Sequence, residues 1–219
     1  RVGWASRSHL PAAPALPDFE LAGVCTTKAE SAEEAKQKYG ARMAFHDYRE
    51  MVTYPEIDAV SVVLRVPAHF EHAMAAIDAG KHVYCEKPLT HNIWEARVIR
   101  EAAAKAKVAT QMGTQIHAGD NYRRVVEVIQ SGAIGPVREV FNWCNKGWSD
   151  GRFGTPKPAP AHLNWDIWLG PAKQREFCDG IHPANWRRFW EYGSGTFGDM
   201  ACHVMDLPFW ALNLRYPTS

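Results

Sequence analysis

The sequence predicts an α/β fold in which a parallel sheet is covered by helices. Between residues 20 and 144, short apolar runs alternate with stretches of helical pattern. Strands separated by helical stretches of about 10–15 residues are typical of parallel βαβ units. The 219 residues are 46% hydrophobic and 22% charged, which is the composition of an ordinary globular protein with a full core.

Six runs are predicted as strands because they are short, apolar and bounded by turn residues. The run 57–64 is the strongest of them, since it is dense in valine and isoleucine. The six runs are 20–25, 43–45, 57–64, 81–85, 108–112 and 136–143. Residues 1–3 are expected to be the tail of a further strand, so the chain begins inside an element and is expected to be a fragment at both ends.

Helices are predicted between these strands from apolar periodicity and from capping residues. Gly40, Gly80 and Gly132 follow three of them and are placed to end them, and Asp47 can cap the start of a short helix. The predicted stretches are 29–39, a short helix after residue 47, 69–79, 92–105 and 121–130.

The charge pattern and the cysteines exclude several classes of protein. The net charge is +1 and lysine and arginine form no long cluster, which argues against a nucleic-acid partner. No run approaches the roughly 20 apolar residues that cross a bilayer, so no membrane partner is expected. The five cysteines, at 25, 85, 144, 178 and 202, have no C-x-x-C spacing and are predicted to be reduced thiols. No signal peptide is visible, and we expect a cytoplasmic protein, although a chain that begins inside an element leaves export open.

A carboxylate, an ammonium and a proline follow one another at the end of the strand predicted at 81–85. These residues are Glu86, Lys87 and Pro88. Ligands of parallel sheets bind beyond the carboxyl ends of the strands, so this lysine is a candidate proton donor or charge clamp. The alternative is an exposed Glu–Lys pair at a turn.

The first turn does not carry the G-x-G-x-x-G pattern of dinucleotide-binding folds, because Gly3 stands alone before Trp4. After the second strand, Thr26, Thr27 and Lys28 stand where an acidic residue usually holds a ribose. Hydroxyls and a lysine tolerate a 2′-phosphate better than a carboxylate does, which favours NADP over NAD. A plain turn with an exposed lysine explains the same residues.

The second part of the chain is rich in tryptophan and in turn residues. A long loop is predicted from residue 147 to 160. Seven of the nine tryptophans lie between residues 143 and 210, where they can line a cleft or fill a core. Trp186 and Arg187 are candidates for stacking on, and bonding to, a planar or anionic ligand.

A helix predicted to begin near Gly198 carries Asp199, His203 and Asp206 on one stripe, at i, i+4 and i+7. A carboxylate that orients an imidazole forms a general acid/base pair. A metal site would need a ligand from another element, since the two aspartates are two turns apart. The third interpretation is a capped helix with a buried, hydrogen-bonded histidine.

Taken together, these residues resemble the Gfo/Idh/MocA oxidoreductase family. Residues 79–89 look like the signature after its fifth strand, 193–206 look like its second signature, and 131–136 resemble the start of its substrate domain. The resemblance implies a Rossmann-like, doubly wound N-terminal domain, expected at 1–116, and a partial α+β substrate domain with an open, mostly antiparallel sheet, expected at 117–219. It also implies a homo-oligomer, a dimer or tetramer formed through that sheet.

The resemblance further implies roles for individual residues. Lys87 corresponds to a catalytic lysine, Asp199 and His203 correspond to an acid/base pair, and the Lys–Pro bond is often cis in the family. Substrate contacts are expected from His117, Lys87 and His203. Contacts with the cofactor, NAD or NADP, are expected from Gly3, Thr26, Thr27, Lys28, Arg65, His69, Glu86, Lys87, Pro88, Trp186 and Arg187.

The implied function is an NAD(P)-dependent oxidoreductase that moves a hydride between the nicotinamide and a sugar or polyol hydroxyl, with no metal. Two departures keep alternatives open. The glycine loop is missing, and residues 64–67 replace the usual Thr-Pro of the fourth strand. Both features resemble a non-catalytic nucleotide sensor of the same fold, and some family members cleave glycosidic bonds through a transient oxidation.

Overall fold

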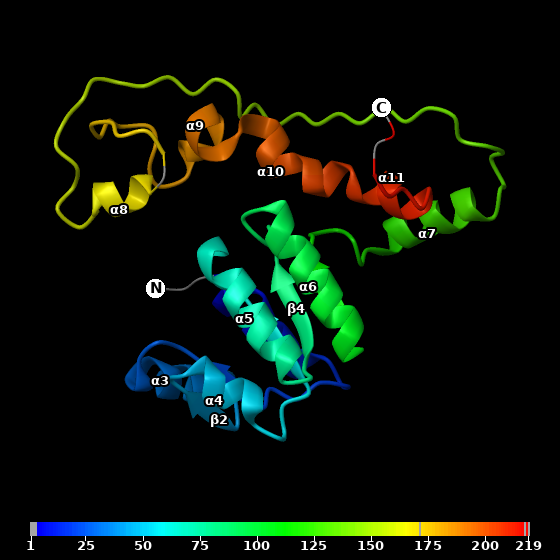
Figure 1. The fold of residues 1–219 in the computed structure, drawn as a ribbon, viewed down its shortest axis with the longest axis horizontal. Coiled ribbons are helices and arrows are strands. Elements are labelled where there is room, and N and C mark those ends of the chain that lie inside the picture. Colours follow the sequence, from blue (N-terminus) through cyan, green and yellow to red (C-terminus); the bar gives the residue numbers. More distant parts are fainter. Residues whose placement is uncertain (1–3, 171, 217, 219) are drawn as a thin grey trace. The chain divides into compact units, whose positions relative to one another are not determined.

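The computed structural model describes residues 4–170, 172–216 and 218, and it divides into two compact units (Figure 1). The first unit is Arg1–Gly113 and the second unit is Thr114–Ser219. The sequence placed this boundary three residues later, after residue 116. The strand tail expected at residues 1–3, and the cofactor contact expected from Gly3, lie outside the described residues.

The first unit contains two parallel sheets. Strands β1 (Gly23–Cys25) and β2 (Met43–Phe45) form one pair. Strands β3 (Ala59–Val62), β4 (His82–Glu86) and β5 (Thr110–Gly113) form a three-stranded sheet in that order. All described neighbours are parallel, as the alternation of strands and helices predicts, because each strand is joined to the next by a helix that crosses back over the sheet.

Helices α3, α4, α5 and α6 follow the predicted stretches closely, and local chemistry explains where they begin and end. Gly40 ends α3 in the left-handed conformation, at φ 72°, where a side chain would be strained. The Asp47 carboxylate accepts a bond from the backbone N–H of Arg49 at 2.9 Å and caps α4. The helices of this unit are α1 (Trp4–Arg7), α2 (His9–Ala12), the 3-10 turn η1 (Ala13–Ala15), α3 (Ala29–Tyr39), α4 (Tyr48–Thr53), α5 (Val66–Asp78) and α6 (Ile93–Ala106).

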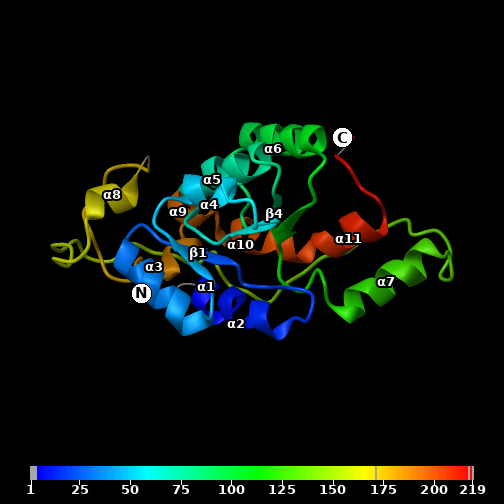
Figure 2. The same cartoon turned by 90° about the horizontal axis from the view of Figure 1, so that it is seen from below.

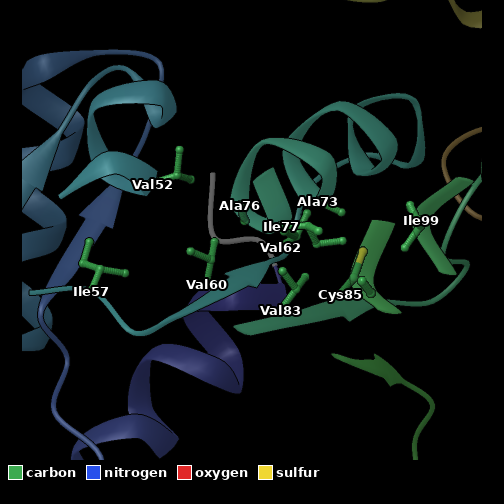
Figure 3. Packing of buried hydrophobic residues seen from close by; sticks show 11 residues of the cluster. Val52, Ile57, Val60, Val62, Ala73, Ala76, Ile77, Val83, Cys85 and Ile99 are labelled. Atoms are coloured by element: carbon green, nitrogen blue, oxygen red, sulfur yellow. The ribbon is translucent and has the colours of Figure 1, made fainter. Parts of the chain in front are cut away.

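The core of the first unit lies between one face of the β3–β4–β5 sheet and helices α5 and α6 (Figures 1 and 3). Alternate strand residues are buried, as in β3, where Val60 and Val62 are 6% and 3% exposed. They pack with residues of α5 such as Ile77, which is 1% exposed. Burial of such a side chain contributes about 1.5–3 kcal/mol. The other face of the sheet presents the intervening residues, among them Ser61 and Tyr84.

The second unit consists of short helices joined by irregular chain. They are α7 (Asp120–Gln130), α8 (Trp165–Leu169), η2 (Asn185–Arg188), α9 (Trp190–Gly193), α10 (Gly195–Val204) and α11 (Asp206–Ala211). Figures 1 and 2 both show α11 beside α7. The seven tryptophans between residues 143 and 210 were predicted to line a cleft or to fill a core. Three of them, Trp165, Trp168 and Trp186, pack around the buried Ile181. The rings of Trp165 and Trp168 stack with centroids 4.7 Å apart, so these tryptophans fill a small core.

The strand predicted over 136–143 is wrong for this structure. Within the described part of the second unit no residue belongs to a strand, and 135–164 form neither helix nor strand. Phe141 and Trp143 are 76% and 83% exposed. A strand exists only where a neighbouring strand satisfies its backbone groups, and no described segment pairs with this one. The open antiparallel sheet implied by the resemblance is therefore not found among the described residues.

All five cysteines are free, as predicted, and Cys85 and Cys178 are buried. Over the described ranges, no helix is both long and apolar enough to cross a bilayer. The same residues contain no group of three or more histidines, cysteines, aspartates or glutamates that could hold a metal ion.

Candidate cofactor and substrate sites

The Glu86–Lys87–Pro88 motif begins on the last residue of β4 and turns away from the sheet. The Lys87–Pro88 peptide bond is cis, as the resemblance implies. Glu86 is paired in register with Gly113 at the end of β5. A Cβ atom at position 113 would lie 2.8 Å from Glu86 Oε1, so the glycine leaves room for the carboxylate to fold across β5. The motif therefore sits at the carboxyl ends of adjacent parallel strands, where open α/β sheets bind their ligands.

His69, on α5, holds the turn that follows this motif. Its side chain is 1% exposed. Nδ1 lies 2.8 Å from the Pro88 carbonyl oxygen and Nε2 lies 3.2 Å from the Leu64 carbonyl oxygen. The imidazole thus links the chain after β4 to the chain after β3. The described contacts of His69 are with these two turns, and the cofactor contact expected from it stays a prediction.

The turn after β1 contains the three residues predicted to recognise the ribose end of the cofactor. The Thr26 hydroxyl donates to the Lys28 carbonyl oxygen at 2.9 Å and lies 2.6 Å from Ser31 Oγ, so it closes the turn onto α3. Thr27 and Lys28 are exposed. Of the three, Thr27 and Lys28 offer a hydroxyl and an ammonium to a ligand, whereas the Thr26 hydroxyl serves the turn.

Cations follow three strands of the first unit. Lys28 follows β1, Arg65 follows β3 at the N-cap position of α5, and Lys87 follows β4. Lys28 and Arg65 are exposed and Lys87 is half-buried. A dinucleotide carries its negative charge on phosphates, and cations at the carboxyl ends of the strands match that charge. The donor set of this unit therefore fits a nicotinamide dinucleotide.

The second unit brings Trp186, Arg187 and Asp199 together. Arg187 Nε lies 3.4 Å from Asp199 Oδ1, and the guanidinium carbon lies 4.6 Å from the centre of the Trp186 ring. Gly193 makes this packing possible, because a Cβ atom there would lie 2.9 Å from the Trp186 carbonyl oxygen. The backbone of Trp186 and Arg187 therefore packs closely against Gly193. The guanidinium stabilises the carboxylate that we expected to orient His203.

The prediction that Asp199, His203 and Asp206 lie on one stripe of a single helix is wrong. Helix α10 begins three residues earlier than predicted and ends at Val204, and Asp206 is the first residue of α11. Asp199 and His203 remain one turn apart on α10, and the His203 carbonyl oxygen accepts a bond from the Tyr122 hydroxyl at 3.2 Å. Asp206 instead meets His117.

His117 and Asp206 form an imidazole–carboxylate pair that spacing along the chain did not reveal. His117 Nδ1 lies 2.7 Å from Asp206 Oδ2, and their side chains are 29% and 19% exposed. The His117 ring stacks on Trp210 with centroids 4.6 Å apart. The turn that presents His117 contains Ile116 at φ 80°, a strained conformation for a β-branched residue. Burial, and secondarily the charge of Asp206, raise the pKa of the Tyr122 hydroxyl nearby. Backbone strain like that of Ile116 is concentrated at functional sites in proteins.

Comparison with protein families identifies the fold. A family model described as "Oxidoreductase family, NAD-binding Rossmann fold" matches residues 2–114, and one described as "Oxidoreductase family, C-terminal alpha/beta domain" matches residues 121–213. The chain belongs to the Gfo/Idh/MocA oxidoreductase family. The resemblance drawn from the sequence, the Rossmann-type fold of the first unit and a nicotinamide dinucleotide as the cofactor are thereby confirmed.

Individual relatives agree with this assignment. Levoglucosan dehydrogenase from Pseudarthrobacter phenanthrenivorans is 28% identical over 202 residues, which are 89% of this chain and 43% of that protein. An NAD binding oxidoreductase from Klebsiella pneumoniae superposes with a TM-score of 0.67 at 28% identity, over 97% of this chain and 51% of that chain. A scyllo-inositol dehydrogenase from Lactobacillus casei, solved with bound NAD(H) and scyllo-inositol, superposes with a TM-score of 0.54 at 26% identity, over 62% and 40%. The chain thus spans about half the length of these Gfo/Idh/MocA relatives.

Proposed function

We propose that this Gfo/Idh/MocA protein is an NAD(P)-dependent dehydrogenase that oxidises a hydroxyl group of a sugar or polyol. The observation that carries the proposal is Lys87, half-buried after Glu86 at the carboxyl end of β4, within a domain of the NAD-binding family. The relatives above are named for levoglucosan and scyllo-inositol, so a cyclic sugar or polyol is the substrate class we propose.

Side chains of the first unit are proposed to hold the cofactor. Thr27 and Lys28 are proposed to bind a 2′-phosphate, which would favour NADP, and Thr26 shapes that turn. The Arg65 guanidinium supplies positive charge for phosphate. Glu86 and Pro88 shape the nicotinamide end, and His69 supports them from below the surface. From the second unit, Trp186 and Arg187 are proposed to approach the cofactor, and Gly3 is the remaining residue expected at the phosphates.

Three residues are proposed to handle the proton and the developing charge. A nicotinamide held beside these residues would supply the acceptor for the hydride of the substrate carbon. The His203 imidazole takes the hydroxyl proton as that hydride leaves, and the Asp199 carboxylate favours the imidazolium that results. The Lys87 ammonium stabilises the negative charge that develops on the substrate oxygen.

His117 is proposed to bind a substrate hydroxyl. Its Nδ1 is occupied by Asp206, so Nε2 is the ring nitrogen available to a polyol. A carboxylate that fixes one nitrogen determines the tautomer and the orientation of the other. The pair therefore supports recognition of a hydroxyl-rich ligand.

The second candidate function is a non-catalytic nucleotide or sugar sensor. It is favoured by the start of the first unit, where two four-residue helices stand in place of a long helix behind a glycine loop. Glycoside cleavage through transient oxidation would use the same residues as the dehydrogenase. We also propose that the protein is cytoplasmic, supported by its five free cysteines, and that it assembles as a dimer or tetramer, which native mass spectrometry can test.

One titration separates enzyme from sensor. The protein is mixed with NAD or NADP, and nicotinamide fluorescence is followed while levoglucosan, inositols and simple sugars are added. Reduced cofactor appearing with one member of the panel supports the dehydrogenase. Cofactor binding without reduction by any member rejects the enzyme and favours the sensor.

Lys87→Ala tests the catalytic lysine. Turnover is expected to fall by at least about 100-fold, the scale for loss of a positioned acid/base or charge-stabilising group. Lys81→Ala is the matched control, since Lys81 precedes the same strand at its opposite end and donates to the Tyr54 carbonyl oxygen. Equal turnover of the two variants would remove Lys87 from the mechanism.

A further inference from the structure

Helix α2 reaches, through His9, the face of the β3–β4–β5 sheet opposite to the one that packs on α5 and α6. In Figure 3 the dark blue N-terminal segment and α5 are on opposite sides of β3 and β4. The residues that this second face presents include Ser61 and Tyr84. Pro11, within α2, and Pro14, within η1, keep the segment in short helical pieces, because proline cannot supply the N–H of a continuous helix.

His9 fastens this segment to the sheet. Its Nε2 lies 2.7 Å from Glu86 Oε1, and its Nδ1 lies 3.0 Å from Ser61 Oγ. Its ring meets Tyr84 edge to face, with centroids 5.3 Å apart. The side chains of His9 and Glu86 are 21% and 17% exposed, so the pair is largely withdrawn from water and is not an ordinary surface ion pair.

Both ring nitrogens of His9 have a hydrogen-bond partner. A neutral imidazole has one N–H and one lone pair. Because an ionised carboxylate only accepts, the Nε2–H tautomer is the one that donates to Glu86, and in it Nδ1 accepts the hydroxyl hydrogen of Ser61. Gly113 leaves the carboxylate the space it occupies, because a Cβ atom at that position would lie 2.8 Å from Glu86 Oε1. His9 therefore joins the N-terminal segment to β3 and β4 and fixes the orientation of Glu86 over β5.

We propose that His9 is a positioning residue that docks the N-terminal segment on the sheet and holds Glu86 in its orientation for cofactor binding. In dinucleotide folds a glycine of the G-x-G-x-x-G turn allows the first helix to pack closely on the strands. The sequence before α1 lacks the G-x-G-x-x-G pattern, and the Ser61–His9–Glu86 chain performs the fastening with side chains. The part of this proposal that concerns the cofactor rests on the proposed function, whereas the docking does not.

Two substitutions separate the contacts of His9. In His9→Gln the amide nitrogen replaces Nε2 and keeps a donor for Glu86. In His9→Asn the amide lies at the position of Nδ1, near Ser61, and the donor to Glu86 is lost. His91→Asn is the control, because His91 pairs with Glu95 at 3.4 Å on the same unit but is 43% exposed.

Hydrogen exchange of the amides of residues 4–12, measured in the full chain without cofactor, tests the docking. His9→Asn is expected to exchange at least about tenfold faster than the wild type, the factor that follows from losing a hydrogen bond to a charged group. His9→Gln and His91→Asn are expected to stay within about threefold of the wild type. Exchange in His9→Asn that matches His91→Asn overturns the docking.

Fluorescence titration of the same variants with NAD and NADP tests the second part of the proposal, that His9 holds Glu86 in its orientation for cofactor binding. The Kd is expected to rise about tenfold in His9→Asn and to return toward the wild-type value in His9→Gln. Faster exchange with an unchanged Kd overturns the role of His9 in cofactor binding while the docking stands. A wild-type protein that binds neither dinucleotide overturns the proposed function, and the exchange measurement still decides whether His9 docks the segment.

Discussion

Replacing His69 tests how the ends of β3 and β4 are held together. The imidazole is 1% exposed, and its two nitrogens lie 2.8 and 3.2 Å from the carbonyl oxygens of Pro88 and Leu64. Carbonyl oxygens only accept, so a neutral ring donates to one of them. His69→Ala removes that donor and leaves a buried acceptor unsatisfied, at a cost of about 1–3 kcal/mol.

The same substitution also empties the space of a buried ring. Truncation of a buried side chain of this size to alanine costs about 2–5 kcal/mol, including the lost packing. The two effects overlap, because the cavity admits water that can bond the orphaned carbonyl, so we expect a total loss of about 3–5 kcal/mol. That is a large part of the stability of an ordinary domain.

Amide exchange of α5 measures this loss in the first unit alone, and urea unfolding followed by far-UV circular dichroism measures it in the whole chain. Exchange in His69→Ala is expected to be at least about 100-fold faster than in the wild type, as about 3 kcal/mol requires. His69→Asn, whose amide can still donate to the Pro88 carbonyl oxygen, is expected to recover part of the loss.

His72→Ala is the matched control. His72 lies on the same helix, is half-buried, and bonds the Ala68 carbonyl oxygen of its own helix at 2.8 Å. We expect its loss to be within about 1 kcal/mol. If His69→Ala and His72→Ala exchange equally fast, the linkage of the two strand ends by His69 is refuted.

Three further outcomes are expected. Gly113→Ala forces a Cβ atom to within 2.8 Å of Glu86 Oε1, so the urea midpoint should fall by the equivalent of about 1–3 kcal/mol, and an unchanged midpoint would show that the carboxylate moves freely. Asp206→Asn removes the charge that holds His117, and kcat/KM for the polyol should fall about tenfold or more; an unchanged value would show that the pair is not used. Burial, followed by the charge of Glu86, raises the pKa of the Cys85 thiol to about 12. Because the reactive species is the thiolate, iodoacetamide at pH 8 should modify Cys85 only after unfolding, and equal rates in native protein and in urea would contradict this. Since the folded pKa lies above the ordinary value of 9.0, the stability contributed by this thiol is present below about pH 9 and is lost as the pH rises toward 12.

Local chemistry made much of the first unit predictable. The helix 29–39 and the strand 43–45 have the predicted bounds, and Gly40 and Asp47 act as the predicted caps. These features depend on residues within a few positions of one another, so the sequence contains the forces that form them. The strand predicted at 136–143 is not found in the structure. A strand requires a neighbouring strand, which the sequence of the segment itself does not contain.

The candidate site divides in the same way. Lys87 was singled out from its neighbours Glu86 and Pro88 and from the strand before them, all of which are adjacent in the chain. The pairing of Asp206 with His117 was not predictable, because it depends on where α10 ends. The helix ends at Val204, so Asp206 leaves the stripe of Asp199 and His203 and bonds a histidine 89 residues away. Helix ends depend on competition between local bonds and tertiary packing, and sequence patterns locate them poorly.

The sequence by itself determined the family, the parallel direction of the strands and the position of the Glu86–Lys87–Pro88 motif at a strand end. Only the tertiary structure decided what surrounds that motif. His69 contacts Pro88 from 19 residues away, and His9 contacts Glu86 from 77 residues away. The energy of such polar contacts depends on tenths of an ångström. Hydrophobic periodicity sets which face of an element is buried, but it carries no information about which polar side chain from a distant segment will meet a given carboxylate or carbonyl.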